Sequence, residues 1–203
     1  MSTSSPFFAM LSRMRLIQRW GLMRNTRAEN VQEHSLQVAV IAHALALISN
    51  RHYAGTFNAE RVAVLGMFHD ASEILTGDLP TPVKYGSEAI RAAYKTLEHQ
   101  AERRLLELLP DDLREDYAPL LDSQQVDPEE QRLVKAADCL AGYLKCVEEA
   151  GAGNHEFRHA ERAQLAKIED LARDVPAVQD FMQRYVPAFS LSLDEISHSP
   201  FQP

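Results

Sequence analysis

The residues with the clearest chemical potential are an adjacent histidine and aspartate, His69 and Asp70, with Glu73 one helical turn later. An imidazole and carboxylates at this spacing can hold a divalent cation or transfer protons. Val62 and Leu65 precede them at helical spacing, so His69 and Glu73 continue an apolar stripe that should face the core. Buried charge is costly unless it is paired or bound to a metal. This conflict marks the segment as a candidate site.

The end of the same segment predicts a stiff loop. Gly77 is expected to end the helix in the left-handed conformation. Pro80 and Pro82 should then prevent the helix from restarting. The loop would therefore present Asp78 and Thr81 beside the His-Asp pair.

Two other predicted helices carry an ionisable residue on or beside an apolar stripe. Asn30 is a favourable N-cap for a helix over residues 31–49, and His34 stands at the start of its apolar face. Asp127 caps a later helix in which Asp138 lies among apolar residues, although aspartate is a poor helix former. A single histidine in such a place is more often a core residue than a ligand, so the prediction depends on the agreement of several helices.

Together these positions supply two imidazoles and two carboxylates from three helices: His34, His69, Asp70 and Asp138. A mixed nitrogen and oxygen donor set suits a borderline divalent ion, and helical bundles build such sites from facing helices. We therefore predict one metal site. Four protein ligands would also suit a closed structural site, so a non-catalytic nucleotide-binding or regulatory helical module is the alternative.

A competing metal site is offered by residues 155–159, which match the H-E-x-x-H motif of metallopeptidases. The motif follows Gly153 and Asn154 directly at a predicted helix start, among charged residues, where a buried zinc helix should be apolar. We expect His155 and His159 to be solvated.

Arg19 and Trp20 are predicted to end the first helix, which begins at Pro6. A guanidinium can bind phosphate with its fork, and an indole can stack on a sugar or a base. The alternative is a core tryptophan beside a surface cation.

No segment alternates with a strand period, so the chain is predicted to be all-α. We expect a single domain over residues 1–203, with a core from about 6 to 186 and a surface tail over 187–203. Of the histidines outside the candidate site, His43 is expected to be solvated and His99 to lie off its helix's main stripe. The other predicted helices cover residues 58–77, 87–109, 111–121, 155–173 and 176–185.

Composition narrows the classes of function. The chain has 203 residues, is 45% hydrophobic and carries a net charge of −8, which argues against binding to nucleic-acid polymers. A phosphate substrate would need local cations or a metal. Cys139 and Cys146 are seven residues apart on one helix, about 10 Å, which is too far for a disulfide. Reduced thiols favour a cytosolic protein; we expect no signal peptide and no segment long enough to span a membrane.

Longer blocks of sequence resemble the HD-domain superfamily of metal-dependent phosphohydrolases, and within it the bacterial 5'-deoxyribonucleotidase branch. The superfamily pattern H…HD…D is matched by His34, the His69-Asp70 pair and Asp138. No motif position departs from that pattern, and the resemblance extends over nearly the whole chain. The more specific blocks are residues 19–20, 24–35, 68–84, 136–138 and 143–145.

The resemblance implies an HD-domain helical bundle that hydrolyses deoxyribonucleoside 5'-monophosphates with one divalent transition-metal ion, either Co, Mn, Zn, Cu or Fe. It implies that the four residues of the H…HD…D pattern bind the metal and that Glu73 and Asp78 serve the attacking water, with their acid and base roles left open. It also implies a cytoplasmic homodimer without a membrane partner. The residues implied to contact the substrate are Arg19, Trp20, His34, Asp70, Asp78, Leu79, Pro80, Thr81 and Asp138.

Overall fold

The computed structural model describes residues 4–84 and 86–198, and within these ranges every regular element is a helix. One isolated antiparallel bridge joins Gln18 to Asn30. The all-α prediction is confirmed. In chain order the elements are α1 (Phe7–Leu11), η1 (Ser12–Leu16), α2 (Val31–His52), α3 (Ala59–Phe68), α4 (Glu73–Thr76), α5 (Thr81–Lys84), α6 (Glu88–Glu107), α7 (Asp111–Leu121), α8 (Pro128–Gly151), η2 (His155–Phe157), α9 (Arg158–Asp174), α10 (Ala177–Arg184), η3 (Val186–Ser190) and α11 (Leu193–His198).

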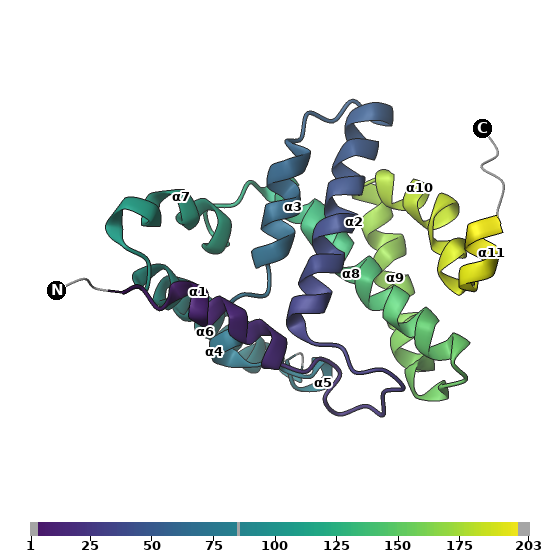
Figure 1. Ribbon diagram of the computed structural model, residues 1–203, viewed down its shortest axis with the longest axis horizontal. Coiled ribbons are helices and arrows are strands. Elements are labelled where there is room, and N and C mark those ends of the chain that lie inside the picture. Colours follow the sequence, from purple (N-terminus) through teal and green to yellow (C-terminus); the bar gives the residue numbers. More distant parts are fainter. Residues whose placement is uncertain (1–3, 85, 199–203) are drawn as a thin grey trace.

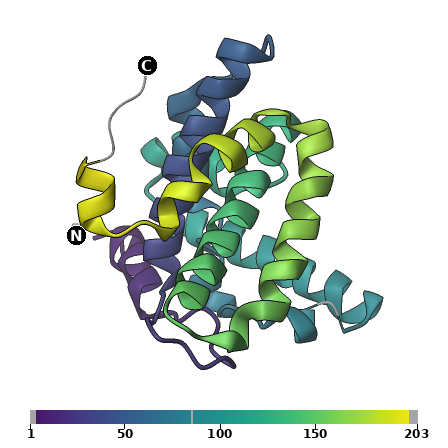
Figure 2. The same cartoon turned by 90° about the vertical axis from the view of Figure 1, so that its right-hand side faces the viewer.

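Helices α2, α3 and α8 cross at the centre of the molecule (Figure 1). Gly66 on α3 allows the close approach to α2, because a Cβ at this position would lie 2.8 Å from the Cα of Ala39. Helix α9 runs beside α8 (Figure 2), and α10 packs against α2 and α9. The three central helices are therefore the frame on which the candidate residues are mounted.

Two groups of buried apolar side chains flank the His-Asp pair. The larger group joins α2, α3 and α8 to α9 and α10 and includes Leu45 and Leu65. The smaller group joins Phe7 of α1 to α6 and α7 and includes Ala71. His69 and Asp70 lie in the chain between Leu65 of the first group and Ala71 of the second, so both cores fix this turn.

The predicted helix starts are confirmed by their caps. The Asn30 side chain accepts a hydrogen bond from the Glu33 amide at 3.0 Å, as an N-cap should. The Asp127 side chain accepts one from the Glu129 amide at 2.8 Å, and α8 begins at the following proline. These two helices carry His34 and Asp138.

The prediction for the first helix was wrong at its end. The helical segment stops at Leu16, and Ile17 is extended. The amide of Arg19 donates to the Glu29 carbonyl at 2.9 Å, so this segment pairs with the residues before α2 instead of continuing as a helix. Arg19 and Trp20 therefore lie in a loop whose two arms are bonded to each other.

The prediction of one helix through Glu73 was also wrong. Helix α3 ends at Phe68, residues 69–72 form a turn, and Glu73 starts the separate helix α4. The amide of Glu73 bonds to the Asp70 carbonyl three residues back, at 3.0 Å, rather than four residues back. This tighter winding breaks the stripe that was predicted to hold His69 and Glu73 on one face.

The loop after α4 differs from the prediction in two respects. Gly77 has φ of 72° as expected, but ψ of 163° places it outside the left-handed helical region. The chain then forms the short helix α5, which contains Pro82, because a proline is tolerated in the first turn of a helix.

Several boundaries need smaller corrections. Residues 155–157 form the 3₁₀ helix η2, and α9 begins only at Arg158. The predicted tail contains part of η3 and α11, while its last residues, 199–203, lie outside the described residues. His43 is half-buried rather than solvated.

Helix α2 also corrects the expectation that no segment is long enough to span a membrane. It has 22 residues, and its most apolar window has a mean hydropathy of 1.2, so length and composition alone would permit a span. However, 56% of that window is buried inside the structure. A core helix of a globular protein has the same properties, so this is weak evidence for a membrane span.

Candidate functional site

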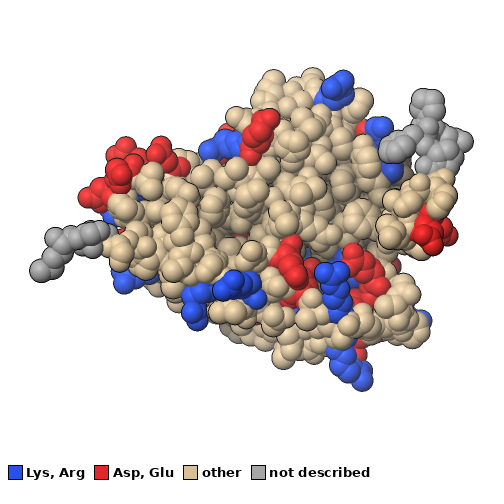
Figure 3. Space-filling model, in the orientation of Figure 1, with Lys and Arg blue, Asp and Glu red and all other residues tan. Residues whose placement is uncertain are grey.

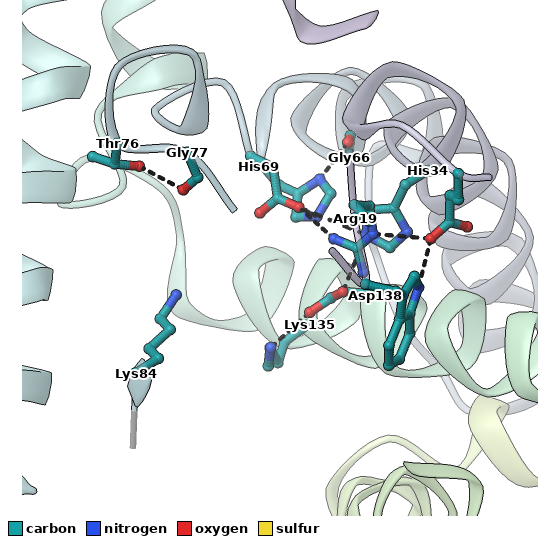
Figure 4. A network of polar contacts seen from close by, with 12 residues as sticks. Arg19, His34, Gly66, His69, Thr76, Gly77, Lys84, Lys135 and Asp138 are labelled. Atoms are coloured by element: carbon teal, nitrogen blue, oxygen red, sulfur yellow. Dashed lines mark hydrogen bonds and ion pairs between the residues drawn. The ribbon is translucent and has the colours of Figure 1, made fainter. Parts of the chain in front are cut away.

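The four residues predicted as metal ligands converge from three directions. His34 projects from the first turn of α2, His69 and Asp70 lie in the turn after α3, and Asp138 projects from α8. Figure 4 shows His34, His69 and Asp138 pointing toward one another, with Arg19 between them. Ligand atoms of His34, His69 and Asp70 all lie within 4.8 Å of one another. Asp138 Oδ1 lies 3.2 Å from His34 Nε2, so the fourth residue adjoins this group.

The imidazole rings of His34 and His69 are buried, and some of their nitrogen atoms have no hydrogen-bond partner among the described residues. His34 is only 1% exposed. Within the described part of the chain, no group is aligned to hydrogen-bond with either of its ring nitrogens or with Nε2 of His69. The Nδ1 atom of His69 lies 2.8 Å from the Gly66 carbonyl, which accepts a hydrogen from it and leaves the Nε2 lone pair directed into the site. Metal-binding histidines are oriented in this way.

The electrostatics of the group favour neutral His34 and ionised carboxylates. Burial, and then the nearby Arg19 cation, lower the pKa of His34. Burial opposes the ionisation of Asp70, but His69 holds the pKa of Asp70 well below its usual range. Burial likewise opposes the ionisation of Asp138, and Lys135, whose Nζ is 2.6 Å from Asp138 Oδ2, is the largest influence lowering its pKa. Burial alone would lower the pKa of His69, yet Asp70 raises it.

These residues fit a divalent cation. Buried polar atoms normally have partners, and imidazole nitrogens with carboxylate oxygens are the donors that borderline divalent ions prefer. Lys135 occupies one oxygen of Asp138 and leaves the other oxygen facing His34. A metal bound by one nitrogen of each ring, beside the carboxylates of Asp70 and Asp138, would satisfy atoms that the described residues leave without an aligned hydrogen bond.

Two further acids lie beside this group. Glu73 is 7% exposed, and its Oε2 atom has no hydrogen-bond partner among the described residues. Burial, followed by the neighbouring charges of Asp70 and Asp78, raises the pKa of Glu73 to about 10. Burial also raises the pKa of Asp78, although Arg19 opposes it. Glu73 is therefore disposed to carry a proton, and the pKa of Asp78 is shifted in the same direction, which suits acid-base chemistry.

Arg19 and Trp20 are tied to the site rather than free at the surface. The Nε atom of Arg19 donates to Glu29 Oε2 at 3.0 Å, and its Nη1 atom donates to Asp70 Oδ2 at 3.4 Å. Asp70 and Asp138 raise the pKa of Arg19 although burial lowers it. The interpretation of Arg19 as a surface cation is therefore wrong.

Trp20 is half-buried, with its ring centroid 5.3 Å from that of the buried Phe157. Its indole N–H donates to Glu29 Oε2 at 2.9 Å. The indole thus packs against Phe157 with the two ring planes at 60°, and its N–H is held by Glu29. Sequence analysis did not identify Glu29, because only the paired backbone of this loop places it beside Arg19 and Trp20.

The loop after α4 is held from the opposite side. The Tyr94 hydroxyl on α6 donates to the Gly77 carbonyl at 3.0 Å, and Lys84 on α5 pairs with Glu98 at 2.7 Å. Asp78 is half-buried between these anchors and the Arg19 loop. The implied substrate contacts that follow it differ in exposure: Leu79 and Pro80 are half-buried, and Thr81 is exposed.

A second buried charged group lies further along α8, and sequence analysis missed it. Lys145 pairs with Glu149, which also accepts hydrogen bonds from Thr26 Oγ1 at 2.7 Å and Asn154 Nδ2 at 2.8 Å. Lys145 also donates to the Arg27 carbonyl. This group fastens the far part of the Arg19 loop to α8.

The H-E-x-x-H motif does not form a site. His155 lies in η2 and His159 in α9, and both are exposed, as predicted. Glu156 pairs instead with Arg24 at 2.6 Å. His99 lies elsewhere, with Nδ1 3.1 Å from Glu102.

Comparison with known proteins gives consistent matches along the chain. The family model described as 5'-deoxynucleotidase YfbR-like matches residues 6–189. A 5'-deoxynucleotidase of Photorhabdus laumondii is 56% identical over 95% of this chain and 97% of its own. The 5'-deoxynucleotidase YfbR of Salmonella typhi is 56% identical over 95% of this chain and 96% of its own.

Solved structures share the fold. An HD-domain phosphohydrolase from Listeria innocua superposes with a TM-score of 0.78 at 22% identity, covering 94% of this chain and 91% of that one. The HD phosphohydrolase of cyanophage S-2L, described as bound to dA and one catalytic Zn²⁺ ion, has a TM-score of 0.61 at 22% identity, covering 90% and 95%.

Proposed function

Because the chain belongs to the YfbR-like 5'-deoxynucleotidase family, we propose that it hydrolyses deoxyribonucleoside 5'-monophosphates to a deoxyribonucleoside and phosphate. It is a phosphoric monoester hydrolase of the HD-domain type. The observation that carries this proposal is the group of His34, His69 and Asp70, which adjoins the Arg19 cation and in which Nε2 of each histidine has no aligned hydrogen bond within the described protein.

One divalent transition-metal ion would be held by His34, His69, Asp70 and Asp138. The closeness of the first three and the 3.2 Å approach of Asp138 to His34 support this assignment. When bound, the ion polarises a phosphoryl oxygen and lowers the pKa of water. Co, Mn, Zn, Cu and Fe all suit these donors.

Arg19 would bind the phosphate. Its Nε atom is used by Glu29, while its Nη1 atom lies 3.4 Å from Asp70 Oδ2. A guanidinium binds phosphate oxygens through paired N–H groups. It would also offset the repulsion that a chain of net charge −8 exerts on a phosphate dianion.

Glu73 and Asp78 would move the protons of the reaction. A bond forms between the water oxygen and phosphorus while the bond from phosphorus to the 5'-oxygen breaks. One proton must therefore leave the water and one must reach the 5'-oxygen. The raised pKa of Glu73 supports a proton-carrying role, since a buried carboxyl that retains its proton can donate it, and the pKa of Asp78 is shifted in the same direction.

The sugar would lie against Trp20 and the segment Leu79–Thr81. The half-buried indole contacts the Phe157 ring in an edge-type arrangement, and its N–H is held by Glu29. A wall fixed in this way offers a 2'-hydroxyl neither room nor a partner, and burying an unpartnered hydroxyl costs about 1–3 kcal/mol. This supports a preference for deoxyribose over ribose.

We further propose a cytosolic homodimer. Cys139 and Cys146 are free and buried, which suits a reducing compartment. Helix α2 exposes Leu36, Val40 and Leu47 at helical spacing, and the middle of the face over α2 carries few charged side chains (Figure 3). A two-fold contact places such a stripe against its own copy; light scattering of the purified protein tests this.

The competing function is a non-catalytic nucleotide-binding module with a structural metal. It leaves unexplained why Glu73, a buried acid with an unpartnered oxygen among the described atoms, stands beside the ligands. Phosphate release from a panel of deoxyribonucleoside and ribonucleoside monophosphates, measured with each metal after chelation, separates the two. Nucleotide binding without release of phosphate would favour the module.

A further inference from the structure

A single carboxylate oxygen holds both side chains assigned to the substrate. Glu29 Oε2 accepts a hydrogen bond from Arg19 Nε at 3.0 Å and another from Trp20 Nε1 at 2.9 Å. The side chains of Arg19 and Glu29 are each 12% exposed, so water competes little for these bonds. The guanidinium of Arg19 and the indole of Trp20 are thus hydrogen-bonded to the same oxygen atom of Glu29.

The backbone fixes Glu29 in place for this task. The Arg19 amide donates to the Glu29 carbonyl at 2.9 Å, and the Val31 amide donates to the Ile17 carbonyl at 3.0 Å. Together with the Gln18–Asn30 bridge, these bonds close the loop at its base. Glu29 is therefore directly opposite Arg19 and only two residues before α2, the helix that carries His34.

The two hydrogen bonds to Glu29 also determine which groups of Arg19 and Trp20 remain available to a substrate. Glu29 uses the Nε edge of Arg19, so the Nη edge is directed at Asp70 Oδ2, 3.4 Å away. Trp20 has a φ of 57°, a conformation that residues other than glycine adopt rarely. The Glu29 bond and the Phe157 ring hold the indole that this backbone presents.

We propose that Glu29 is a positioning residue that couples phosphate binding to sugar discrimination by orienting Arg19 and Trp20 through one oxygen atom. It does not touch the substrate. The proposal rests on the proposed deoxyribonucleotidase activity. Its consequence is that loss of one carboxylate weakens binding of every nucleotide and, in addition, reduces the preference for deoxyribose.

The test compares deoxyadenosine and adenosine 5'-monophosphate as substrates of the metal-loaded protein. In Glu29→Ala we expect kcat/KM for the deoxynucleotide to fall about 100-fold, as misplaced binding groups cause, mainly through KM. The ratio of the two kcat/KM values should fall at least several-fold, while metal content stays at the wild-type level. Glu29→Gln keeps an accepting oxygen and should recover part of both losses.

Trp20→Phe tests the same link from the other side, because it removes the indole N–H and leaves an aromatic ring. It should lower the preference for deoxyribose and leave phosphate binding by Arg19 largely unchanged. In the double variant with Glu29→Ala the preference should fall no further than in Glu29→Ala alone, since the two changes remove one interaction. If Glu29→Ala folds poorly, Glu29→Gln and Trp20→Phe carry the test, and an unchanged ratio of the two kcat/KM values in both would overturn the proposal.

Glu33→Ala is the matched control, an exposed glutamate four residues away on α2, and should match the wild type in rate and preference. A lower melting temperature in Glu29→Ala with an unchanged substrate ratio would assign Glu29 a structural role only and overturn the proposal. If the wild-type protein itself released no phosphate from deoxyadenosine monophosphate and its deoxynucleotide analogues, the proposed function would fail instead.

Discussion

Helix α8 contributes to two buried charged groups, and they differ in whether their polar atoms have partners. His34 and Glu149 are each 1% exposed. Glu149 accepts hydrogen bonds from Lys145, Thr26 and Asn154. Around Asp138, in contrast, ring nitrogens of His34 and His69 have no aligned partner among the residues described.

Equal burial with unequal pairing separates a structural group from a functional one. A fully paired ionic group holds two segments in register, and its polar atoms have nothing left to offer a ligand. A group with leftover lone pairs costs stability unless something outside the described chain satisfies them. By this criterion Lys145–Glu149 fastens the Arg19 loop to α8, and we propose the His34 group as the reaction centre.

The largest expected effect is loss of the reaction centre in Asp138→Ala. The variant should lose the metal and at least about a thousand-fold in turnover, because metal stabilisation of developing charge amounts to several kcal/mol. His155→Ala is the control and should lose neither. Metal analysis and phosphate release measure both; loss of metal in His155→Ala alone would restore the H-E-x-x-H motif as the site.

The second-largest effect is expected at the two acids beside the predicted metal ligands. Glu73→Gln and Asp78→Asn should keep the metal and lose about 100- to 10,000-fold in kcat, the usual contribution of acid-base catalysis. Metal content and kcat are measured on the same preparations. A variant that purifies without metal would identify its residue as a ligand, and the set of four would be wrong.

At the Lys145–Glu149 pair, a substitution should lower the free energy of unfolding. Glu149→Ala leaves Lys145 buried without its partner, which typically costs about 3–5 kcal/mol. Chemical denaturation of the chelator-treated protein measures this loss. The native variant should still bind the metal, since Asp138 is unchanged. An unaltered free energy of unfolding would show that burial of the pair is not what fastens the loop.

The smallest effect is the dependence of this stability on pH. The hydrogen bonds from Lys145 and Thr26 hold the pKa of Glu149 below its ordinary value, although burial opposes them. The stabilisation is therefore fully present above the ordinary value of about 4.3 and is lost as the pH falls below it. The melting temperatures of wild type and Glu149→Gln, both with chelator, should differ most at pH 7 and converge toward pH 3. A constant difference would contradict this.

Sequence reasoning succeeded where local signals determine structure. Asn30 and Asp127 fix the starts of α2 and α8 and hence the faces that carry His34 and Asp138. It failed where contacts between segments far apart in the chain determine the structure. The break after Phe68 depends on two separate cores that hold Leu65 and Ala71, which no local pattern encodes.

The same reason explains the residues that were missed. Glu29 becomes significant only because the backbone pairs it with Arg19. Glu149 becomes significant only because the loop brings Thr26 to α8, more than a hundred residues later in the chain. In the sequence, these two glutamates cannot be distinguished from ordinary solvent-exposed acidic residues.

The central claim is that the unpartnered His34 and His69 nitrogens are a metal centre for phosphate release, and metal reconstitution tests it most directly. Chelator-treated wild-type protein is titrated with Mn²⁺, Co²⁺ or Zn²⁺ while bound metal and phosphate release from a deoxyribonucleoside 5'-monophosphate are followed together. We predict that activity rises in proportion to binding and saturates at one ion per chain. Full activity in the metal-free protein, or saturation only at two tightly bound ions, would contradict the account.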